Sequence, residues 1–433
     1  MRGMIKGKGG AVILGLLAVA VVAGADEPAK QTLPIGIPAA GPPSPVATSP
    51  TCESASDLTV YWKDGLRMDT CDENFRFKLG GRALWDATVW DANNEIEAAI
   101  GDDLRNGTEF RSARLYFAGE IYKYVVFKAE YDFANDSGTD FKDVYIGVQD
   151  VFVDGSAILL GNNKVPFSLE EVTSNRFITF MERGLPNAFA PSRETGLHVS
   201  APFLDDRLFA AFAVSQTAED DQFTHTGNNF NVTGRLAGVP YINGDDQLVH
   251  LGVAYSYAML ENDEAQYSQR PEVHQSPNFV DTGILDANTA NTVGVEAATV
   301  WGPFSAQGEY MRNFVDSDAT NDPSLWGYYA FVSYFVTGEH RAYKVGEAKF
   351  DRVKVKRNFL AEGGGAGAWE LALRYSYLNL NDELADGGNL SDITAGVNWY
   401  LNPNTRLMFN YVYADLKDVD ETSAFMMRTQ IDF

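Results

Sequence analysis

Basic side chains at positions suited to anion binding are the part of this sequence most able to do chemistry. Four lie among alternating apolar and polar residues, and four more lie in the segment 163–194. They are Arg82, Arg114, Lys128 and Arg235 in the alternating stretches, and Lys164, Arg176, Arg183 and Arg193 in the long segment. Fixed positive groups can replace the hydration shell of an anion, and the planar guanidinium group binds two phosphate oxygens at once. This pattern indicates the binding and passage of anions.

Acidic side chains in the same stretches offer each cation a second role, in an ion pair. The acids are Glu120, Glu130, Asp132 and Asp143 in the alternating stretches, and Glu170, Glu171, Glu182 and Glu194 in the long segment. The formal net charge is −25, but most acids cluster in expected outer loops, and screening limits their reach to about 10 Å. From the sequence alone, the cations either face a passing anion or are neutralised by their neighbours.

Residue patterns that would support catalysis or metal binding do not occur at the required spacing. The five histidines are scattered, and the two cysteines lie apart from them. The glycine-rich run 363–367 is not followed by the Lys-Ser/Thr pair of a phosphate-binding loop. We therefore expect no enzymatic activity, no metal and no cofactor. The acidic composition also disfavours nucleic acid as a partner.

The elements that must position these side chains are strands with one apolar and one polar face. At the end of the chain, Phe425, Met427, Thr429, Ile431 and Phe433 alternate with Met426, Arg428, Gln430 and Asp432. Alternate side chains of a strand point to opposite faces, which suits a barrel with lipid outside and a polar lumen inside. The pattern recurs near 74–89, 109–121, 123–133, 141–148, 156–162, 195–201, 207–215, 228–238, 247–257, 292–300, 303–312, 327–337, 368–378, 391–400, 405–413 and 424–433. It predicts an all-β, transmembrane, antiparallel β-barrel of about 16 strands, an even number.

The lengths of the connections between these strands agree with such a barrel. Short turns near 121–123, 202–207, 300–303 and 400–405 alternate with long segments at 90–108, 163–194, 216–227, 258–291, 313–326, 379–390 and 414–423. Short periplasmic turns and long extracellular loops are typical of outer-membrane barrels. Two connections depart from this alternation: 134–140 is short on the outside, and 338–367 is long and basic on the inside. The basic segment is either a cationic exit funnel or a solvated turn.

Exposed aromatic residues favour a membrane barrel over a soluble β-sandwich, which would show the same alternation. Those expected in the interfacial girdles are Trp85, Tyr116, Tyr124, Tyr257, Trp301, Tyr310, Tyr328, Tyr329, Trp399 and Tyr411. The segment 163–194 is long for a loop of a compact barrel, so we expect it to fold into the lumen and narrow the pore.

The first 73 residues precede the predicted barrel. Residues 1–25 combine a basic start, an apolar stretch and a small-residue cleavage site, which predicts a signal peptide. Residues 26–56 form a Pro- and Ala-rich linker, and residues 57–73 a short hairpin, with the barrel at 74–433. Cys52 and Cys71 either pair, closing a loop of about 20 residues, or remain free thiols.

Several segments resemble the phosphate-selective porins of outer membranes, the O and P porins. The matching segments are Asn74 to Arg82, Phe110 to Tyr116, Pro166 to Ser174, Met181 to Arg183, Trp301 to Tyr310, Thr337 to Glu339, Ala368 to Leu371 and Gly396 to Tyr400. They occur in the family's order over about 70–433. The resemblance implies a 16-stranded barrel, usually a homotrimer, with an inward-folded constriction loop and an anion-binding zone.

The resemblance also assigns candidate anion ligands. Arg82, Arg111, Ser174 and Arg176 fall where the family draws ligands from the wall and the constriction loop, and we add Arg114 and Lys164 from their positions. There are three departures from the family pattern. Ser112 replaces a common arginine, Glu171 stands where a lysine can occur, and Arg270 is the one arginine or lysine of the loop 258–291.

The sequence predicts an outer-membrane porin for passive diffusion of small anions, with phosphate or polyphosphate as candidate solutes. Its other expected partners are outer-membrane lipid and lipopolysaccharide. One alternative is a general or weakly cation-preferring porin on the same fold, with the arginines tied up in ion pairs. The other is a structural or adhesive surface barrel with acidic loops.

Overall fold

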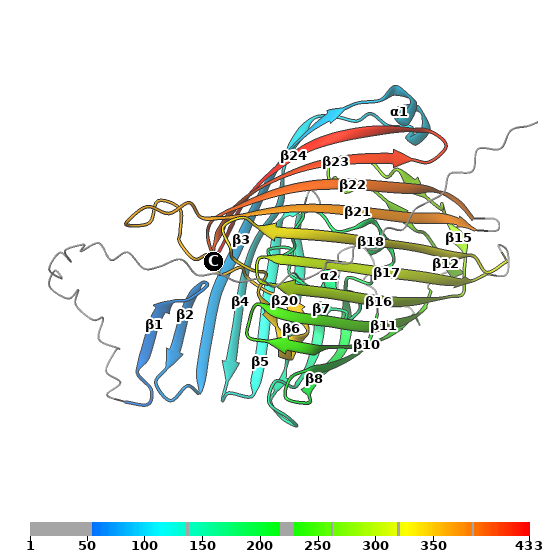
Figure 1. Ribbon diagram of the computed structural model, residues 1–433. Helices are drawn as coiled ribbons and strands as arrows, with labels where there is room; N and C mark the ends of the chain where they lie inside the picture. The colour runs from blue at the N-terminus through cyan, green and yellow to red at the C-terminus, as the bar shows by residue number, and fades with distance from the viewer. Residues whose placement is uncertain (1–53, 136–137, 217–228, 261–262, 318–320, 383–384) are drawn as a thin grey trace, which may run out of the picture. The chain divides into compact units, whose positions relative to one another are not determined.

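The computed structural model describes residues 54–135, 138–216, 229–260, 263–317, 321–382 and 385–433 (Figure 1). The predicted signal peptide and most of the predicted linker lie outside these residues, as does Cys52. Cys71 is disulfide-bonded. No helix in the described ranges has the length and apolar character needed to cross a membrane.

A closed antiparallel barrel of sixteen strands forms most of the described chain, which confirms the predicted fold class. The barrel strands are β3 (Phe75–Asp91), β4 (Gly107–Ile121), β5 (Val125–Asn135), β6 (Gly138–Gln149), β7 (Ala157–Lys164), β8 (Arg193–Phe203), β9 (Leu208–Gln216), β10 (Asn231–Asn243), β11 (Gln247–Met259), β16 (Thr289–Trp301), β17 (Phe304–Asp316), β18 (Ser324–Phe335), β21 (Ala368–Asp382), β22 (Ala385–Asn402), β23 (Thr405–Leu416) and β24 (Asp420–Asp432). Each of the sixteen segments predicted from alternation overlaps one of them.

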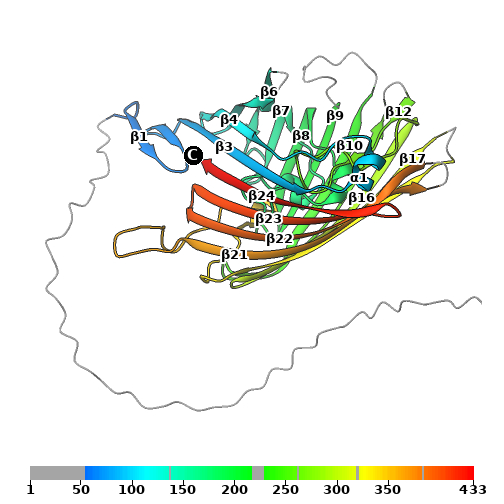
Figure 2. The ribbon, with the colours of Figure 1, turned by 90° about the horizontal axis from the view of Figure 1, so that it is seen from above.

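The barrel closes where the last strand pairs with the first. β24 pairs with β3 from Ser423 opposite Asp91 to Asp432 opposite Arg82. Below this seam, a hairpin of β1 (Leu58–Trp62) and β2 (Leu66–Thr70) pairs with the start of β3. Figure 2 shows β24 beside β3, with the C-terminus close to the hairpin. The sheet therefore has two more strands at the rim that carries the chain's C-terminus.

The two faces of each strand are separated as the alternation predicts. On β21, Leu371, Leu373 and Tyr375 are exposed on the outer face, whereas Arg374 and Ser376 are fully buried on the inner face. An apolar outer face and a polar interior are the arrangement expected of a barrel in lipid.

Two of the aromatic residues expected in the girdles face inward instead. Tyr116 and Tyr329 are 7% and 2% exposed. Tyr116 lies between Lys78 and Lys128, whose ammonium groups are 5.3 and 5.2 Å from its ring centre. Tyr329 could not share an outer face with Tyr328, because adjacent side chains of a strand point to opposite faces.

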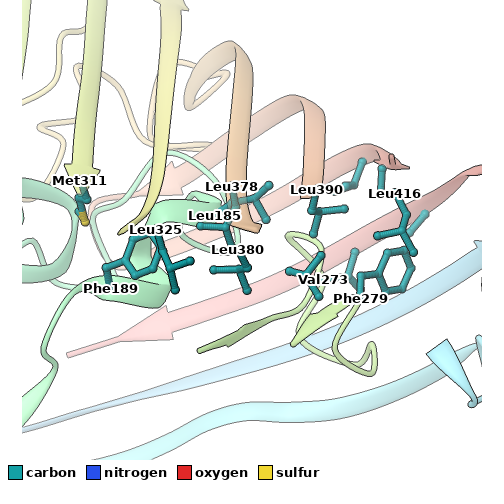
Figure 3. Packing of buried hydrophobic residues seen from close by; sticks show 14 of the residues in the cluster. Leu185, Phe189, Val273, Phe279, Met311, Leu325, Leu378, Leu380, Leu390 and Leu416 are labelled. Carbon is teal, nitrogen blue, oxygen red and sulfur yellow. The ribbon is translucent and has the colours of Figure 1, made fainter. Parts of the chain in front are cut away.

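Two outer loops fold inward and pack together inside one side of the barrel. The first carries α2 (Leu169–Val172) and the 3₁₀ helix η1 (Leu185–Phe189). The second carries four two-residue strands, β12 (Glu264–Ala265), β13 (Ser268–Gln269), β14 (Val280–Asp281) and β15 (Leu285–Asp286). Apolar residues of both loops pack against Leu378, Leu390 and other residues of the wall (Figure 3).

Two further segments complete the fold. Helix α1 (Asn94–Ile100) lies in the loop between β3 and β4, with Asn93 as its N-cap and Gly101 in the left-handed conformation at its end. The inner segment between β18 and β21 contains β19 (Tyr343–Lys344), the 3₁₀ helix η3 (Val345–Glu347) and β20 (Lys349–Phe350).

Candidate functional site

The loop of residues 165–192 folds into the barrel and is held there by buried wall arginines. Arg374 of β21, Arg406 of β23 and Arg428 of β24 are at most 2% exposed. They donate hydrogen bonds to the loop carbonyl oxygens of Glu182, Ile178 and Met181 at 2.9, 2.9 and 2.5 Å. These bonds attach the loop to one side of the wall, which confirms the predicted inward-folded constriction loop.

The beginning of this loop is fixed by a carboxylate of β17, which β18 alone separates from β21. Glu309 of β17 accepts hydrogen bonds from the amides of Leu169 and Glu170 at 3.0 and 2.8 Å. Ser168 caps the same short helix by accepting from the amide of Glu171 at 3.1 Å. The amides at the start of α2, which have no partner within the helix, are therefore satisfied by side chains.

The second inward loop joins the first through Arg374. Its guanidinium group donates to Glu272 of the second loop at 2.9 Å and pairs with Glu170 of the first at 3.3 Å. Asp392 of β22 accepts from the amide of Glu272 at 2.8 Å. Both loops are thus anchored to the same side of the barrel, and the open lumen lies on the other side.

The inner segment 338–367 also enters the lumen. Arg235 donates to the carbonyl oxygen of Ala348 at 2.8 Å, and Tyr343 lies 2.5 Å from the imidazole of His250. Phe350 shares a buried apolar cluster with Leu169 of the constriction loop. The constriction is therefore built from both ends of the barrel.

The lumen contains a cavity of about 1400 Å³ between the constriction loop, the inner segment and the wall from β3 to β10. Its lining includes sixteen of the chain's 34 basic residues and only ten of its 59 acidic residues. Lys344, Lys349 and Arg352 of the inner segment are among them. This placement supports the interpretation of the basic segment as a funnel rather than as a solvated turn.

Three of the predicted site residues meet at the constriction. A terminal guanidinium nitrogen of Arg82 lies 3.2 Å from the hydroxyl of Ser174, and Nε of Arg176 lies 3.2 Å from the same oxygen. Arg82 also donates to the side-chain oxygen of Asn175 at 2.7 Å. Arg176 has one carboxylate partner in the described part of the chain, Asp432 at 3.8 Å, and Asp432 also pairs with Arg352.

Two other predicted residues lie beside this group and are paired. Arg114 pairs with Asp132 at 2.6 Å and with Glu130 at 3.1 Å, and Glu130 also pairs with Arg82. Lys164 pairs with Glu171 at 3.2 Å.

Arg111 stands apart from the other predicted site residues. Its guanidinium group makes two hydrogen bonds to Glu182, at 2.9 and 3.0 Å. A β-bulge between β3 and β4 skips Arg111, because Leu84 pairs with Ser112 and Trp85 pairs with Phe110. The bulge lets Arg111 and Ser112 both reach the lumen, although strict alternation would place them on opposite faces.

The ion pairs in the wall form a network with an excess of positive charge. Four cations share three carboxylates: Arg82, Arg114, Lys128 and Arg193 contact Glu130, Asp132 and Asp143. Sharing leaves the network with one formal positive charge more than its carboxylates balance.

Carboxylates of the constriction loop stay ionised within this positive surrounding. Burial alone would raise the pKa of Glu182, but attraction by Arg111 and Arg428 brings it well below its usual range. The pKa of Glu171 is lowered too, because attraction by Arg183 and Lys164 outweighs burial.

Several residues of the site were missed from the sequence. Arg67 of β2 and Lys78 of β3 are direct register partners, both line the cavity, and neither has a carboxylate partner in the described ranges. Asn175 was also missed, although it follows Ser174 directly. Pairing the predicted hairpin with β3 could have placed Arg67 opposite Lys78, whereas nothing in the local pattern marks Asn175.

Comparisons with known proteins identify the relatives of this chain. The family model described as phosphate-selective porin O and P matches residues 77–433. Porin O of Pseudomonas aeruginosa is 28% identical over 426 residues, covering 87% of this chain and 93% of that protein. An uncharacterised protein of Caulobacter vibrioides is 30% identical over 407 residues, covering 89% of this chain and 79% of that protein.

Solved porin structures share the fold. The anion-selective porin from Comamonas acidovorans aligns with a TM-score of 0.55 at 15% identity, over 83% of this chain and all of that one. OmpT of Vibrio cholerae aligns with a TM-score of 0.53 at 10% identity, over 83% of this chain and 98% of that one. At these identities the likeness concerns the fold alone.

Proposed function

The chain belongs to the phosphate-selective porin O and P family, and we propose that it lets small anions, phosphate among them, diffuse passively through its lumen. The fold and the family are those of an outer-membrane channel rather than of an enzyme. One observation carries the proposed selectivity: a strongly acidic protein places nearly half of its basic residues around one cavity. A lumen lined by one sign of charge raises the local concentration of the opposite ion.

The proposed binding point for an anion at the constriction is the group Arg82, Ser174 and Arg176. Two guanidinium groups and a hydroxyl converge there, and these are groups that bond phosphate oxygens. Among the described residues, Arg176 has only a distant and shared carboxylate partner, so it is more available to a solute than Arg82, which pairs with Glu130. Binding must remain weak enough for the anion to leave. The neighbouring carboxylates of the wall network repel the anion and so keep its affinity low.

The path toward the C-terminal rim is positive as well. Arg67 and Lys78 face each other across strands, which is destabilising for like charges unless an anion or solvent lies between them. Lys344, Lys349 and Arg352 of the inner segment also line the cavity, in ion pairs with Glu347, Asp351 and Asp432. Arg67 and Lys78, which have no carboxylate partner among the described residues, are therefore the cations that an anion leaving the constriction meets.

The ion pairs also support a second candidate, a general or weakly cation-preferring porin. Arg82, Arg111, Arg114 and Lys164 each contact a carboxylate, as that alternative requires. The excess of basic over acidic residues in the cavity favours the anion porin.

We propose three further features of the protein. Residues 1–25 direct export and are cleaved, so the mature protein consists of the linker 26–56, the hairpin 57–73 and the barrel 74–433. The barrel assembles as a homotrimer. Its outer rim contacts lipopolysaccharide.

The test is single-channel recording of the mature protein in planar bilayers, with a potassium chloride gradient and then added phosphate. We expect an anion-selective reversal potential and a chloride current that phosphate blocks. Arg176→Ala should weaken this block. Arg357→Ala is the matched control, because Arg357 lies exposed on the inner segment and its side chain bonds the carbonyl oxygen of Gly363.

Each other outcome has a defined meaning. A cation-selective current indifferent to phosphate would contradict the anion proposal and support the general porin. No current from folded protein would favour a structural or adhesive barrel. Equal effects of both substitutions would contradict the placement of the site at Arg176.

A further inference from the structure

An apolar groove crosses the outer face of the barrel, away from the lumen. It has a volume of about 1110 Å³ and runs over β10, β11, β16 and β17. Its outward-facing side chains are exposed: Leu236 47%, Leu251 53%, Val253 53%, Val295 44% and Tyr310 37%. Because the protein is an outer-membrane barrel, this face lies against lipid.

The groove lies over a transverse row of four residues, in which Leu251 is the one large side chain. Gly238, Leu251, Ala297 and Gly308 are successive register partners across the four strands, and three of the four have no atom beyond Cβ. The neighbouring row is Leu236, Val253, Val295 and Tyr310, which are larger. The difference in height between the two rows leaves a trough along the sheet.

One end of the groove reaches an unpaired cation. Arg207 lies in the turn between β8 and β9, lines the groove and is exposed. Its carbonyl oxygen accepts from the amide of Val239 at 2.8 Å. A Cβ added at Gly238 would lie 2.3 Å from that oxygen, so glycine is needed for the turn to approach. Among the described residues, no carboxylate lies within ion-pair distance of Arg207.

In the described structure, neither neighbouring acid of the turn forms an ion pair with this cation. Asp206 lines the lumen cavity, on the other side of the wall. Asp205 is exposed and forms no ion pair within the described ranges. This turn is at the same rim as the end of β24, which is the rim of short turns and therefore the periplasmic one.

We propose that this groove is a binding site for an anionic phospholipid of the periplasmic leaflet. One acyl chain lies along the row of small residues, and the phosphate group pairs with Arg207. Three strand spacings between β10 and β17 make the row about 14 Å long.

A second copy of the chain fits the groove less well than a lipid does. A facing barrel wall would rest on the tall row and leave the trough empty, whereas a single acyl chain is narrow enough to follow it. The cation at one end adds a reason for an amphiphile with a negative head group.

The test is native mass spectrometry of the full mature protein with added phosphatidylglycerol or phosphatidylethanolamine. Ala297→Phe fills the trough with a ring, and Ala395→Phe is its matched control on the exposed face of β22. Arg207→Gln removes the cation, and Lys123→Gln removes one exposed charge from another short turn at the same rim.

We expect a retained phosphatidylglycerol that Ala297→Phe abolishes and Ala395→Phe leaves in place. Arg207→Gln should weaken phosphatidylglycerol binding about fivefold and remove its advantage over phosphatidylethanolamine, while Lys123→Gln should not. The proposal is overturned if no lipid is retained, or if both phenylalanine variants behave alike. A change of oligomeric state with Ala297→Phe would assign the groove to a contact between copies. Arg207 is exposed in a turn, so we expect Arg207→Gln to fold normally. It therefore tests the proposal even if Ala297→Phe does not fold.

Discussion

Replacing Arg406 by leucine should loosen the constriction loop without leaving an unpaired buried charge. Arg374 and Arg428 have carboxylate partners, so removing either would strand an acid. Arg406 has none in the described part of the chain; it bonds Tyr400, Gln430 and the loop carbonyl oxygens of Ile178 and Arg176. The substitution therefore removes the attachment of the loop without leaving a carboxylate unpaired.

The size of the effect follows from the two bonds that Arg406 makes to the loop, at 2.9 and 3.2 Å. A hydrogen bond to a charged group contributes about 1.5–3 kcal/mol, which sets an upper limit of about 3–6 kcal/mol for both. Gln430 still donates to the carbonyl oxygen of Arg176, so one of the two loop carbonyls keeps a partner. We therefore expect a net loss of about 1–3 kcal/mol in loop attachment, which raises the population of detached loops about 5- to 150-fold.

The assay is single-channel conductance with and without phosphate. A detached loop widens the pore, so conductance and current noise should both rise. Phosphate block should weaken, because Arg176 and Ser174 lie on the same loop. Arg312→Leu is the control, since Arg312 is exposed on β17 and its Nε bonds the hydroxyl of Ser324. Unchanged conductance, noise and block in Arg406→Leu would refute the view that the wall arginines hold the constriction.

Three further predictions follow from single contacts. Arg111→Ala should reduce anion selectivity while the channel stays folded, because Arg428 continues to bond Glu182; a shifted reversal potential with unchanged heat-modifiable gel mobility would show this. Gly80→Ala should cost about 1–3 kcal/mol in unfolding free energy, since the new Cβ would lie 2.4 Å from Tyr116 and 2.5 Å from the carbonyl oxygen of Phe433. Gly234→Ala, which meets nothing closer than 4.0 Å, should unfold like the parent protein in urea. Burial alone would raise the pKa of Glu347, but attraction by Lys349 and Lys344 lowers it to about 2. The stability that Glu347 contributes is therefore complete above pH 4.5 and should be lost between about pH 4.5 and pH 2, seen as faster proteolysis of the inner segment in acid. Loss of protection in alkali instead of acid would contradict this sign.

The barrel could be predicted from the sequence because its signal is local. Alternation over eight to ten residues marks each strand, and the alternation of short and long connections places each strand end at one rim or the other. The inward course of loop 165–192 followed from its length and place. None of these inferences requires knowledge of which strands face each other across the lumen.

The features that could not be predicted from the sequence depend on contacts between residues far apart in the chain. Arg374, Arg406 and Arg428 lie roughly 200 residues or more from the loop carbonyls that they bind. The bulge at Arg111 depends on one unpaired residue between two strands, and Tyr116 turns inward between lysines of neighbouring strands. Period-two alternation carries no information about such partners.

β3 pairs with both β24 and the β1–β2 hairpin, and these two pairings can form at different stages of folding. The closing contacts of β24 join residues more than 300 positions apart, so they carry the largest loop-closure entropy in the barrel. The hairpin and β3 are neighbours in sequence and can pair at once. From the first stage of folding, the lower part of β3 therefore has its backbone edge covered. Only the part of β3 from Arg82 to Asp91 stays unpaired on this edge until β24 forms. This directs β24 to a single register and limits pairing of the newly made chain with other chains.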